Sequence, residues 1–451
     1  MKNALEKDWT QGSIVQNLWF LSWPMLVSQS LNMIGPTLDM IWVGRLGSAS
    51  IAGVGVAAMA VMLINSLLMG LQMGARAMVA RAIGAGDKEA ASHAAQQAFV
   101  VAGGFALVIV PLGMFLAEPI LVIMGLEADV IAEGAAYMRL MFIAAAGMSF
   151  RMIVDGIMQA SGDSVTPMRI AVVFRIVQAT ICPLLIFGVW IFPDMGVRGA
   201  AVAEIIGQVV ALSIGIRALF GGHTRLRLTV KDFHLDPGII WRIVKIGIPA
   251  SIMGMQRSLG NLVLVKIIVP FGTVAVAAHT LCQRMEMFIL MPAMGIGMGS
   301  GVLAGQNMGA AKPDRAEKSV WIAAGVVEGL MVCSSICILL WAEHLIGIFG
   351  PEPEVRALGA QFLRIATAGF VVFGFEPVLM HSLSGVGDTL PPMLATVISF
   401  WVLIIPLGYF LPQITDLGVH GVRWAMAIGM IAIALSLVAY FKLGRWKRKK
   451  V

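Results

Sequence analysis

Charged residues are scarce in this chain of 451 amino acids: aspartate, glutamate, lysine and arginine together make up 13% of it, whereas 59% of the residues are hydrophobic. Soluble domains carry about 25% charged residues. Because the buried fraction of a globular protein grows only slowly with size, a soluble fold of this length would leave much apolar surface in water. The composition therefore excludes a soluble multidomain protein and indicates that the apolar excess faces lipid.

Cysteine is scarce, and recognisable catalytic motifs are lacking. The four cysteines all lie within apolar segments, and their spacing fits neither a zinc site nor a disulfide framework. No Walker A sequence, HExxH, G-x-S-x-G or histidine–cysteine cluster is present. We therefore expect no enzymatic activity, no metal and no cofactor, and nothing supports an ATP-driven pump or an intramembrane hydrolase.

The hydrophobic residues are collected in runs long enough to cross a membrane as helices. A hydrocarbon core about 30 Å thick requires roughly 20 apolar residues per helix, and the runs lack the alternation of a transmembrane β-barrel. The sequence predicts an all-α integral membrane protein with twelve transmembrane helices, over residues 14–43, 49–77, 91–117, 130–160, 165–190, 197–220, 238–268, 275–302, 317–342, 355–383, 391–411 and 421–441.

The formal net charge of +7 reflects topology rather than a nucleic-acid partner, because the basic residues gather in alternate loops and in the tail from Lys442 to Lys450. The opposite loops are acidic, with Glu118, Asp194 and Glu343 among their residues. The positive-inside rule then places both termini in the cytoplasm, at the cell (inner) membrane, and the even number of spans gives the same result.

The sequence aligns with itself after a shift of 225 residues. The matching positions include Pro24 and Pro249, Gly70 and Gly295, Gly74 and Gly299, Gly162-Asp163 and Gly387-Asp388, and Pro167 and Pro392. Each repeat holds six spans, so both halves enter the membrane in the same direction, and such repeats bind substrate between them and move by rocking. We predict an N-terminal six-helix lobe (1–220), a cytoplasmic linker (221–237) and a pseudo-symmetric C-terminal lobe (238–451) with the basic tail.

Asp39 is the first ionisable residue predicted to lie within a span, and such residues are costly enough to be functional candidates. It shares a helical face with Asn32, Gly35 and Pro36. Because Pro36 cannot donate to the carbonyl of Asn32, that oxygen is left free beside the carboxylate. This arrangement suits a proton or a sodium ion. In the competing interpretation, Asp39 lies at the membrane interface and simply pairs with Arg45.

Other intramembrane charges in the first half also have two interpretations. Glu204 follows a run of small apolar residues, and it is either a functional carboxylate or part of a structural ion pair with Arg175. Arg151 and Asp155 are four residues apart on one helix, and the favoured interpretation is that they form a structural ion pair in which the two charges neutralise each other.

The second half carries six more charges within predicted spans, and mutual neutralisation is favoured over ion transport for each of them. They are Arg257, Lys266, Arg284, Glu286, Glu328 and Glu376.

Taken together, the repeat and the motifs near the helix ends resemble the MATE (multidrug and toxic compound extrusion) transporter family along nearly the whole chain. The motifs are Pro24, Asp39 followed by Val43-Gly44-Arg45-Leu46-Gly47, Gly74 to Gly84-Ala85-Gly86-Asp87, Ser161-Gly162-Asp163 to Pro167, Pro183 to Gly188, Gly196 to Ala203, and their second-half counterparts. The resemblance implies a V-shaped pair of six-helix lobes that exports cationic amphiphiles against an inward flow of protons or sodium ions.

The resemblance also implies where coupling occurs. In the prokaryotic DinF-like branch, the coupling site in the N-terminal lobe uses the helix 1 aspartate, an asparagine and an aspartate on helix 5, and a threonine on helix 6. Here Gln178 and Cys182 stand at the helix 5 positions, and Glu204 stands at the helix 6 position. We expect Asp39 and Glu204 to face each other, since close carboxylates share a proton. Cys182 is a poor sodium ligand, which favours protons.

The NorM-like branch provides the contrasting pattern, with acids in helices 7 and 10. This chain has Arg257 and Phe373 at those positions. A sodium site of that kind is therefore not expected.

The sequence thus predicts a monomeric proton-coupled exporter of organic compounds, embedded in membrane lipid. The predicted substrate cleft includes Asn32, Met33, Pro36, Asp155, Arg257, Asn261, Glu286 and Glu376. The alternative is a flippase of lipid-linked oligosaccharides or polyprenyl phosphates from the same superfamily, which the basic residues of the second half keep open. A non-transporting receptor or membrane enzyme is a third class, and the repeat argues against it.

Overall fold

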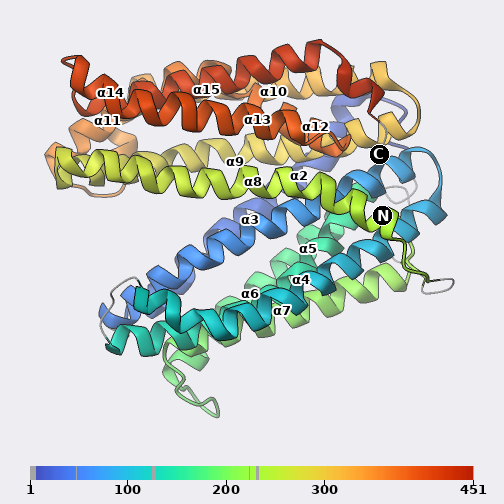
Figure 1. The fold of residues 1–451 in the computed structure, drawn as a ribbon, viewed down its shortest axis with the longest axis horizontal. Coiled ribbons are helices and arrows are strands. Elements are labelled where there is room, and N and C mark those ends of the chain that lie inside the picture. Colours follow the sequence, from blue (N-terminus) through green and yellow to red (C-terminus); the bar gives the residue numbers. More distant parts are fainter. Residues whose placement is uncertain (1–6, 47, 124–127, 223, 230–232, 450–451) are drawn as a thin grey trace. The chain divides into compact units, whose positions relative to one another are not determined.

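The computed structural model describes residues 7–46, 48–123, 128–222, 224–229 and 233–449. A few helical residues within these ranges, Met33, Pro36 and Asp39 among them, have side chains that lie outside the description. The described residues are mostly helical and contain no strand (Figure 1). The predicted all-α membrane fold is therefore confirmed.

Long helices dominate both halves of the sequence. The first half contains α2 (Ile14–Val43), α3 (Ser48–Gly84), α4 (Lys88–Ile123), α5 (Ala128–Ser161), α6 (Val165–Phe187) and α7 (Val197–Phe220). The second half contains α8 (Pro237–Ile268), α9 (Thr273–Gly309), α10 (Pro313–Gly347), α11 (Pro353–Phe373), α12 (Phe375–Gly385), α13 (Leu390–Ile398), α14 (Ile405–Ile414) and α15 (Val419–Lys442). Short 3₁₀ turns occupy Val269–Phe271 and Arg445–Arg448.

Eleven helices within the described residues are long and apolar enough to cross a membrane. The predicted span over residues 14–43 corresponds to α2, which includes side chains outside the description. The predicted span over 391–411 is one helix in which a π-helical segment, Ser399–Ile404, joins α13 to α14.

The repeat is visible in the backbone where the last long helix of each half begins. Gly196 precedes α7 and Gly418 precedes α15, and both have φ 53° and ψ −134°. An L-residue with a side chain rarely adopts this conformation, so glycine is required at both positions. The two halves thus share a turn as well as a sequence register.

Contacts divide the chain into two compact units. Unit 1 consists mainly of Val27–Ser251, and unit 2 consists of Trp9–Leu26 together with Ile252–Val451. Segment 9–26 of the predicted N-terminal lobe lies in unit 2, segment 238–251 of the predicted C-terminal lobe lies in unit 1, and the bounds of the lobes and of the linker stay a prediction. The first part of α2 belongs to unit 2, and the first part of α8 belongs to unit 1.

Equivalent glycines make room for these two helix segments. In unit 1, Gly70 of α3 lies so close to Ser251 of α8 that an added Cβ would overlap it, and the Ser251 hydroxyl donates to the carbonyl of Leu67 at 3.1 Å. In unit 2, Gly295 of α9 lies against Leu26 of α2 in the same way. Small residues allow this close backbone approach in membrane helices. The 225-residue repeat therefore preserves a packing contact.

Each unit has its own hydrophobic core. In unit 1, α5 packs against α3, α4 and α7, and α6 packs against α7. In unit 2, α9 packs against α10, α11 and α12, and α15 packs against α11. Polar side chains that lie on the inner faces of α5, α6, α7, α9 and α15 are consequently removed from lipid and must find partners within the bundle.

Candidate functional site

The polar centre of unit 1 is Glu204 on α7. Its carboxylate is half-buried and accepts two hydrogen bonds, from Gln178 Nε2 on α6 to Oε2 at 2.7 Å and from Gln208 Nε2 to Oε1 at 2.8 Å. Cys182 lies one turn after Gln178 on α6 and is fully buried. The structure thus brings together Glu204 and Gln178, two of the predicted coupling residues. Gln208 was not singled out from the sequence, although its position one turn after Glu204 could have indicated it.

Each of the two glutamines, Gln178 and Gln208, also accepts a hydrogen bond from an arginine. Arg151 Nε on α5 donates to Gln208 Oε1 at 2.7 Å, and Arg175 Nη1 on α6 donates to Gln178 Oε1. Both guanidinium groups lie 5.0 Å from the centroid of the Phe174 ring. The amide of Gln178 therefore hydrogen-bonds both Arg175 and Glu204. It takes the place of the direct ion pair between these two residues that was considered from the sequence.

Arg151 continues the network to Asp155. Its Nη1 donates to Asp155 Oδ2 at 2.9 Å, and both side chains are almost completely buried. This is the neutralising pair that the four-residue spacing favoured. Asp155 is engaged in this ion pair, and its assignment to a substrate cleft stays a prediction.

Helix α2 reaches the same network at Gly35. A Cβ added at Gly35 would overlap the guanidinium of Arg175, so the backbone of α2 lies directly against that group. The side chains of Met33, Pro36 and Asp39 lie outside the described residues, and the expected approach of Asp39 to Glu204 stays a prediction. Asn32 is exposed, and its amide donates to Gln29 Oε1 at 3.4 Å.

Unit 2 contains an ion pair between α8 and α12. Arg257 Nη2 donates to Glu376 Oε1 at 2.8 Å, and the side chain of Glu376 is 2% exposed. Asn261, one turn further along α8, is half-buried. Two of the predicted cleft residues therefore neutralise each other, in line with the interpretation favoured for this half.

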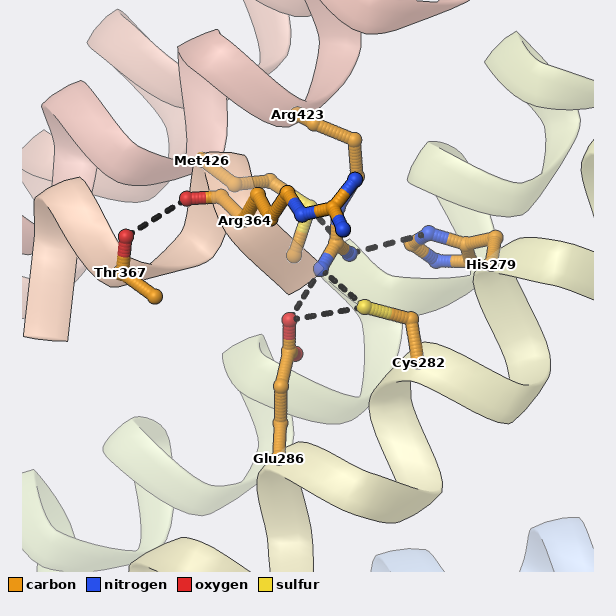
Figure 2. Close-up of polar contacts among 7 residues, drawn as sticks. All are labelled: His279, Cys282, Glu286, Arg364, Thr367, Arg423 and Met426. Atoms are coloured by element: carbon orange, nitrogen blue, oxygen red, sulfur yellow. Dashed lines mark hydrogen bonds and ion pairs between the residues drawn. The ribbon is translucent and has the colours of Figure 1, made fainter. Parts of the chain in front are cut away.

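A second buried cluster in unit 2 surrounds Arg423 on α15. Figure 2 shows its guanidinium directed toward three side chains of α9: it donates to Glu286, to Cys282 Sγ at 2.8 Å and to His279 Nδ1 at 3.3 Å. The Cys282 thiol donates in turn to Glu286 Oε1 at 3.4 Å. Glu286 is thus held in an ion pair, and its place in a substrate cleft stays a prediction.

Sequence reasoning missed Arg423 as the partner of Glu286. The available signal was that Arg423 is a basic residue inside an otherwise apolar predicted span, because such a residue requires an acid within the bundle.

The remaining intramembrane charges of unit 2 differ in their surroundings. Glu328 on α10 lies against Gly374, at the junction between α11 and α12. Lys266 and Arg284 are exposed. Among the side chains that the structure describes, no three histidine, cysteine, aspartate or glutamate residues are grouped as metal ligands would be.

The repeated helical units and the buried charged networks define a polytopic membrane protein of the secondary-transporter class. A family model for MatE matches residues 24–184 and 249–410, and the chain belongs to this family. The resemblance identified from the sequence motifs is therefore confirmed. Assignment to the DinF-like branch stays a prediction.

Curated relatives carry names that refer to drug resistance. A "Probable multidrug resistance protein NorM" of Thermotoga maritima is 26% identical, over 100% of this chain and 97% of its own length. A "Probable multidrug resistance protein YoeA" of Bacillus subtilis is 24% identical, over 95% of this chain and 93% of its own length. The chain is therefore similar to multidrug efflux transporters over almost its entire length.

Solved structures support the same fold. A crystal structure of MATE in complex with MaL6 is 22% identical, has a TM-score of 0.91 and is matched over 100% of both chains. An outward-facing conformation of a multidrug resistance MATE family transporter of the MOP superfamily is 23% identical, has a TM-score of 0.90 and covers 98% of both chains. At these identities the likeness concerns the fold alone.

Proposed function

We propose that this protein is an antiporter that exports cationic or amphiphilic organic compounds and is driven by inward proton flow, with Glu204 as the carboxyl group that carries the proton. Family membership supports small-molecule efflux. The observation that supports a coupling role for Glu204 is its place at the centre of the hydrogen-bond network formed by α5, α6 and α7. Among the side chains that the structure describes, no cation pairs directly with Glu204, and a carboxylate in such a position inside a membrane bundle is a candidate for proton transfer.

Protons are favoured over sodium by the composition of the network. A hard cation is bound by several oxygen ligands, and a thiol such as that of Cys182 is a poor substitute. Both oxygens of Glu204 already accept hydrogen bonds from amide groups, and two guanidinium groups stand directly behind those amides. A sodium ion at Glu204 would have to displace an amide donor and lie close to fixed positive charge, whereas a proton requires neither a coordination shell nor additional ligands.

The other parts of the proposal follow from the sequence. The two repeats support alternating access by movement of the halves, and the basic loops and tail support a cytoplasmic position for both termini. Relatives of this family differ in substrate: one in Shewanella oneidensis, 22% identical, is named "FAD transporter". The substrate class proposed here rests on the multidrug resistance names of the nearer relatives. These names do not favour the flippase alternative.

Transport by purified protein in liposomes tests the proposal. A fluorescent organic cation should move against its gradient when a pH gradient is imposed, and an equal sodium gradient at constant pH should drive no movement. Glu204→Gln should abolish the response to the pH gradient while the protein remains folded. Transport driven by sodium alone, or wild-type coupling in Glu204→Gln, would show that the coupling assignment is wrong.

A further inference from the structure

The basic tail that follows α15 contains an ordered 3₁₀ turn, Arg445–Arg448. Gly444 before the turn has φ 69°, a conformation that suits glycine and lets the chain fold back on the end of α15. Trp446 within the turn is 1% exposed, and its indole Nε1 donates to the carbonyl of Phe441 at 3.0 Å. A buried side chain therefore holds the turn against unit 2.

The geometry of the turn brings two arginines together. A 3₁₀ helix has three residues per turn, so side chains three positions apart lie one above the other. Arg445 and Arg448 consequently lie on the same side of the turn, and both are exposed. The residues between them have other surroundings, since Trp446 packs in the core of unit 2 and Lys447 pairs with α10. The turn thus presents two guanidinium groups on one surface, with about 6 Å of rise between their backbones.

The acids near the turn are engaged by the lysines of the tail. Lys447 pairs with Glu317 at 2.6 Å and with Asp314 at 3.3 Å, and Lys449 pairs with Asp388 at 3.0 Å. Within the described part of the chain, no acidic side chain forms an ion pair with either arginine of the turn. The tail therefore contains two kinds of cation, lysines that are neutralised and arginines that are not.

The position of the turn indicates what the arginines meet. It follows α15, the last helix of the chain that is long and apolar enough to cross a membrane. Lys442 at the end of this helix is exposed, and Leu443 after it is 67% exposed. Basic side chains near the ends of membrane helices reach the level of the lipid headgroups. An exposed leucine directly before the turn favours this boundary over open water.

We propose that Arg445 and Arg448 form a binding site for the phosphate group of an anionic phospholipid, and that Trp446 is the residue that positions them. This inference goes beyond the transport function and does not depend on it. Guanidinium groups bind phosphate oxygens through paired, charge-assisted hydrogen bonds. Because the turn is already ordered by Trp446, binding does not have to overcome the entropy of fixing a flexible tail.

The site differs from a general attraction between a basic tail and an anionic membrane. Such attraction depends on how many cations lie near the surface. At the proposed site it also depends on the turn, because the two arginines share one side only while the 3₁₀ conformation is kept. Loss of Trp446 leaves every charge in place and releases the turn, so it separates the two explanations.

The experiment measures binding of phosphatidylglycerol, and of phosphatidylcholine with the same acyl chains, to the purified full-length protein by native mass spectrometry. Arg445→Gln and Arg448→Gln should each weaken phosphatidylglycerol binding roughly fivefold, the contribution of one basic residue beside an anionic headgroup. Phosphatidylcholine binding should not change. Arg217→Gln is the matched control, because it removes one exposed cation from the last turn of α7, the helix equivalent to α15, and should leave both affinities unchanged.

Thermal unfolding gives a second readout that a purely structural role would not move. The rise in Tm produced by phosphatidylglycerol, relative to that produced by phosphatidylcholine, should be smaller in either arginine variant than in the wild type. Trp446→Ala removes no charge and should weaken phosphatidylglycerol binding as well. The arginine variants change exposed side chains, so they keep the test decisive if Trp446→Ala does not fold.

Each contrary result overturns a stated part of the proposal. Wild-type phosphatidylglycerol affinity in the Arg445→Gln/Arg448→Gln double variant, or an equal loss in Arg217→Gln, would overturn the site. Inorganic phosphate that stabilises the protein as strongly as the lipid, through the same two arginines, would overturn the assignment to a phospholipid. Unchanged binding in a folded Trp446→Ala variant would overturn the positioning role.

Discussion

Arg76 on α3 packs its aliphatic stem against Gly156 on α5, where an added Cβ would lie 3.1 Å from the arginine Cγ. After the 225-residue shift these positions become Gly301 on α9 and His381 on α12, so the bulky residue and the glycine have changed places. Gly301 lies against the backbone carbonyl of His381. The repeat therefore preserves the close helix contact, but the glycine lies on α5 in unit 1 and on α9, the helix equivalent to α3, in unit 2.

Gly301→Ala should destabilise the protein because the new Cβ would lie 2.5 Å from the carbonyl oxygen of His381, and backbone atoms cannot turn aside as a side chain can. Overpacking of this kind costs about 1–3 kcal/mol. Gly325→Ala on α10 is the control, since its Cβ would meet nothing within 4 Å. Thermal unfolding in detergent should show a lower Tm for Gly301→Ala and an equal or higher Tm for the control; equal Tm values for both would contradict the packing analysis.

The Arg423–Glu286 pair should show strong coupling in a double-mutant cycle. Arg423 is 2% exposed, so Arg423→Met leaves the carboxylate of Glu286 buried without its cation. Breaking a buried pair in this way costs about 3–5 kcal/mol. Adding Glu286→Gln removes the uncompensated charge, and the double variant should therefore be more stable than Arg423→Met alone. Additive losses of Tm in the two single variants would show that the residues do not interact.

The tail after α15 should stabilise unit 2. The side chain of Trp446 is 1% exposed and stacks on Phe441 with ring centroids 4.7 Å apart. Two lysines that follow Trp446 in the sequence pair with acids, Lys447 with Glu317 at 2.6 Å and Lys449 with Asp388 at 3.0 Å.

Trp446→Ala should accordingly cost about 3–5 kcal/mol, the usual range for truncation of a buried aromatic residue. Trp241→Ala is the comparison, because Trp241 is 61% exposed. Thermal unfolding should separate the two variants clearly. A similar Tm for both would mean that the tail does not pack on unit 2 in solution.

Asp236 should make stability depend on pH at the acidic end. Its Oδ1 accepts hydrogen bonds from the backbone N–H groups of Ile239 at 3.1 Å and Gly238 at 2.8 Å, at the start of α8, and its Oδ2 lies 3.5 Å from His93 Nε2. The hydrogen bond from Ile239, followed by that from Gly238 and the contact with His93, lowers the pKa of Asp236 below its ordinary value.

Because the pKa is lower in the folded state, the carboxylate stabilises the fold above the unfolded value of about 3.9, and this contribution is lost as the pH falls through the folded value. Tm measured from pH 6 downward, to about pH 3, should therefore fall more steeply for the wild type than for Asp236→Ala. Parallel curves would indicate that ionisation of Asp236 makes no contribution to the stability of the fold.

The sequence was most informative where interactions are local or repeated. Helical spans follow from apolar runs of sufficient length, and the ion pair between Arg151 and Asp155 follows from four-residue spacing on one helix. The repeat register also predicted which glycines occupy equivalent places. These features depend on neighbours along the chain or on the chain's likeness to itself.

Long-range partners could not be predicted because they depend on how helices rotate and pack. Arg423 and Glu286 are 137 residues apart, and their pairing requires a particular face of α15 to meet a particular face of α9. The first part of α2 belongs to unit 2 and the first part of α8 to unit 1, and the hydrophobicity of the sequence likewise does not predict this. In the network around Glu204, the family position indicated Gln178, while the amide orientations follow only from the positions of both arginines.

The most direct measurement of the central claim is proton movement caused by substrate movement. Liposomes that contain the purified protein and a trapped pH indicator are given a gradient of an organic cation with no pH or sodium gradient. The wild type should move protons in the direction opposite to the substrate, and Glu204→Gln should move none. Equal proton movement in Glu204→Gln, or substrate exchange that requires sodium and leaves the pH constant, would contradict a proton-coupled antiporter that operates through Glu204.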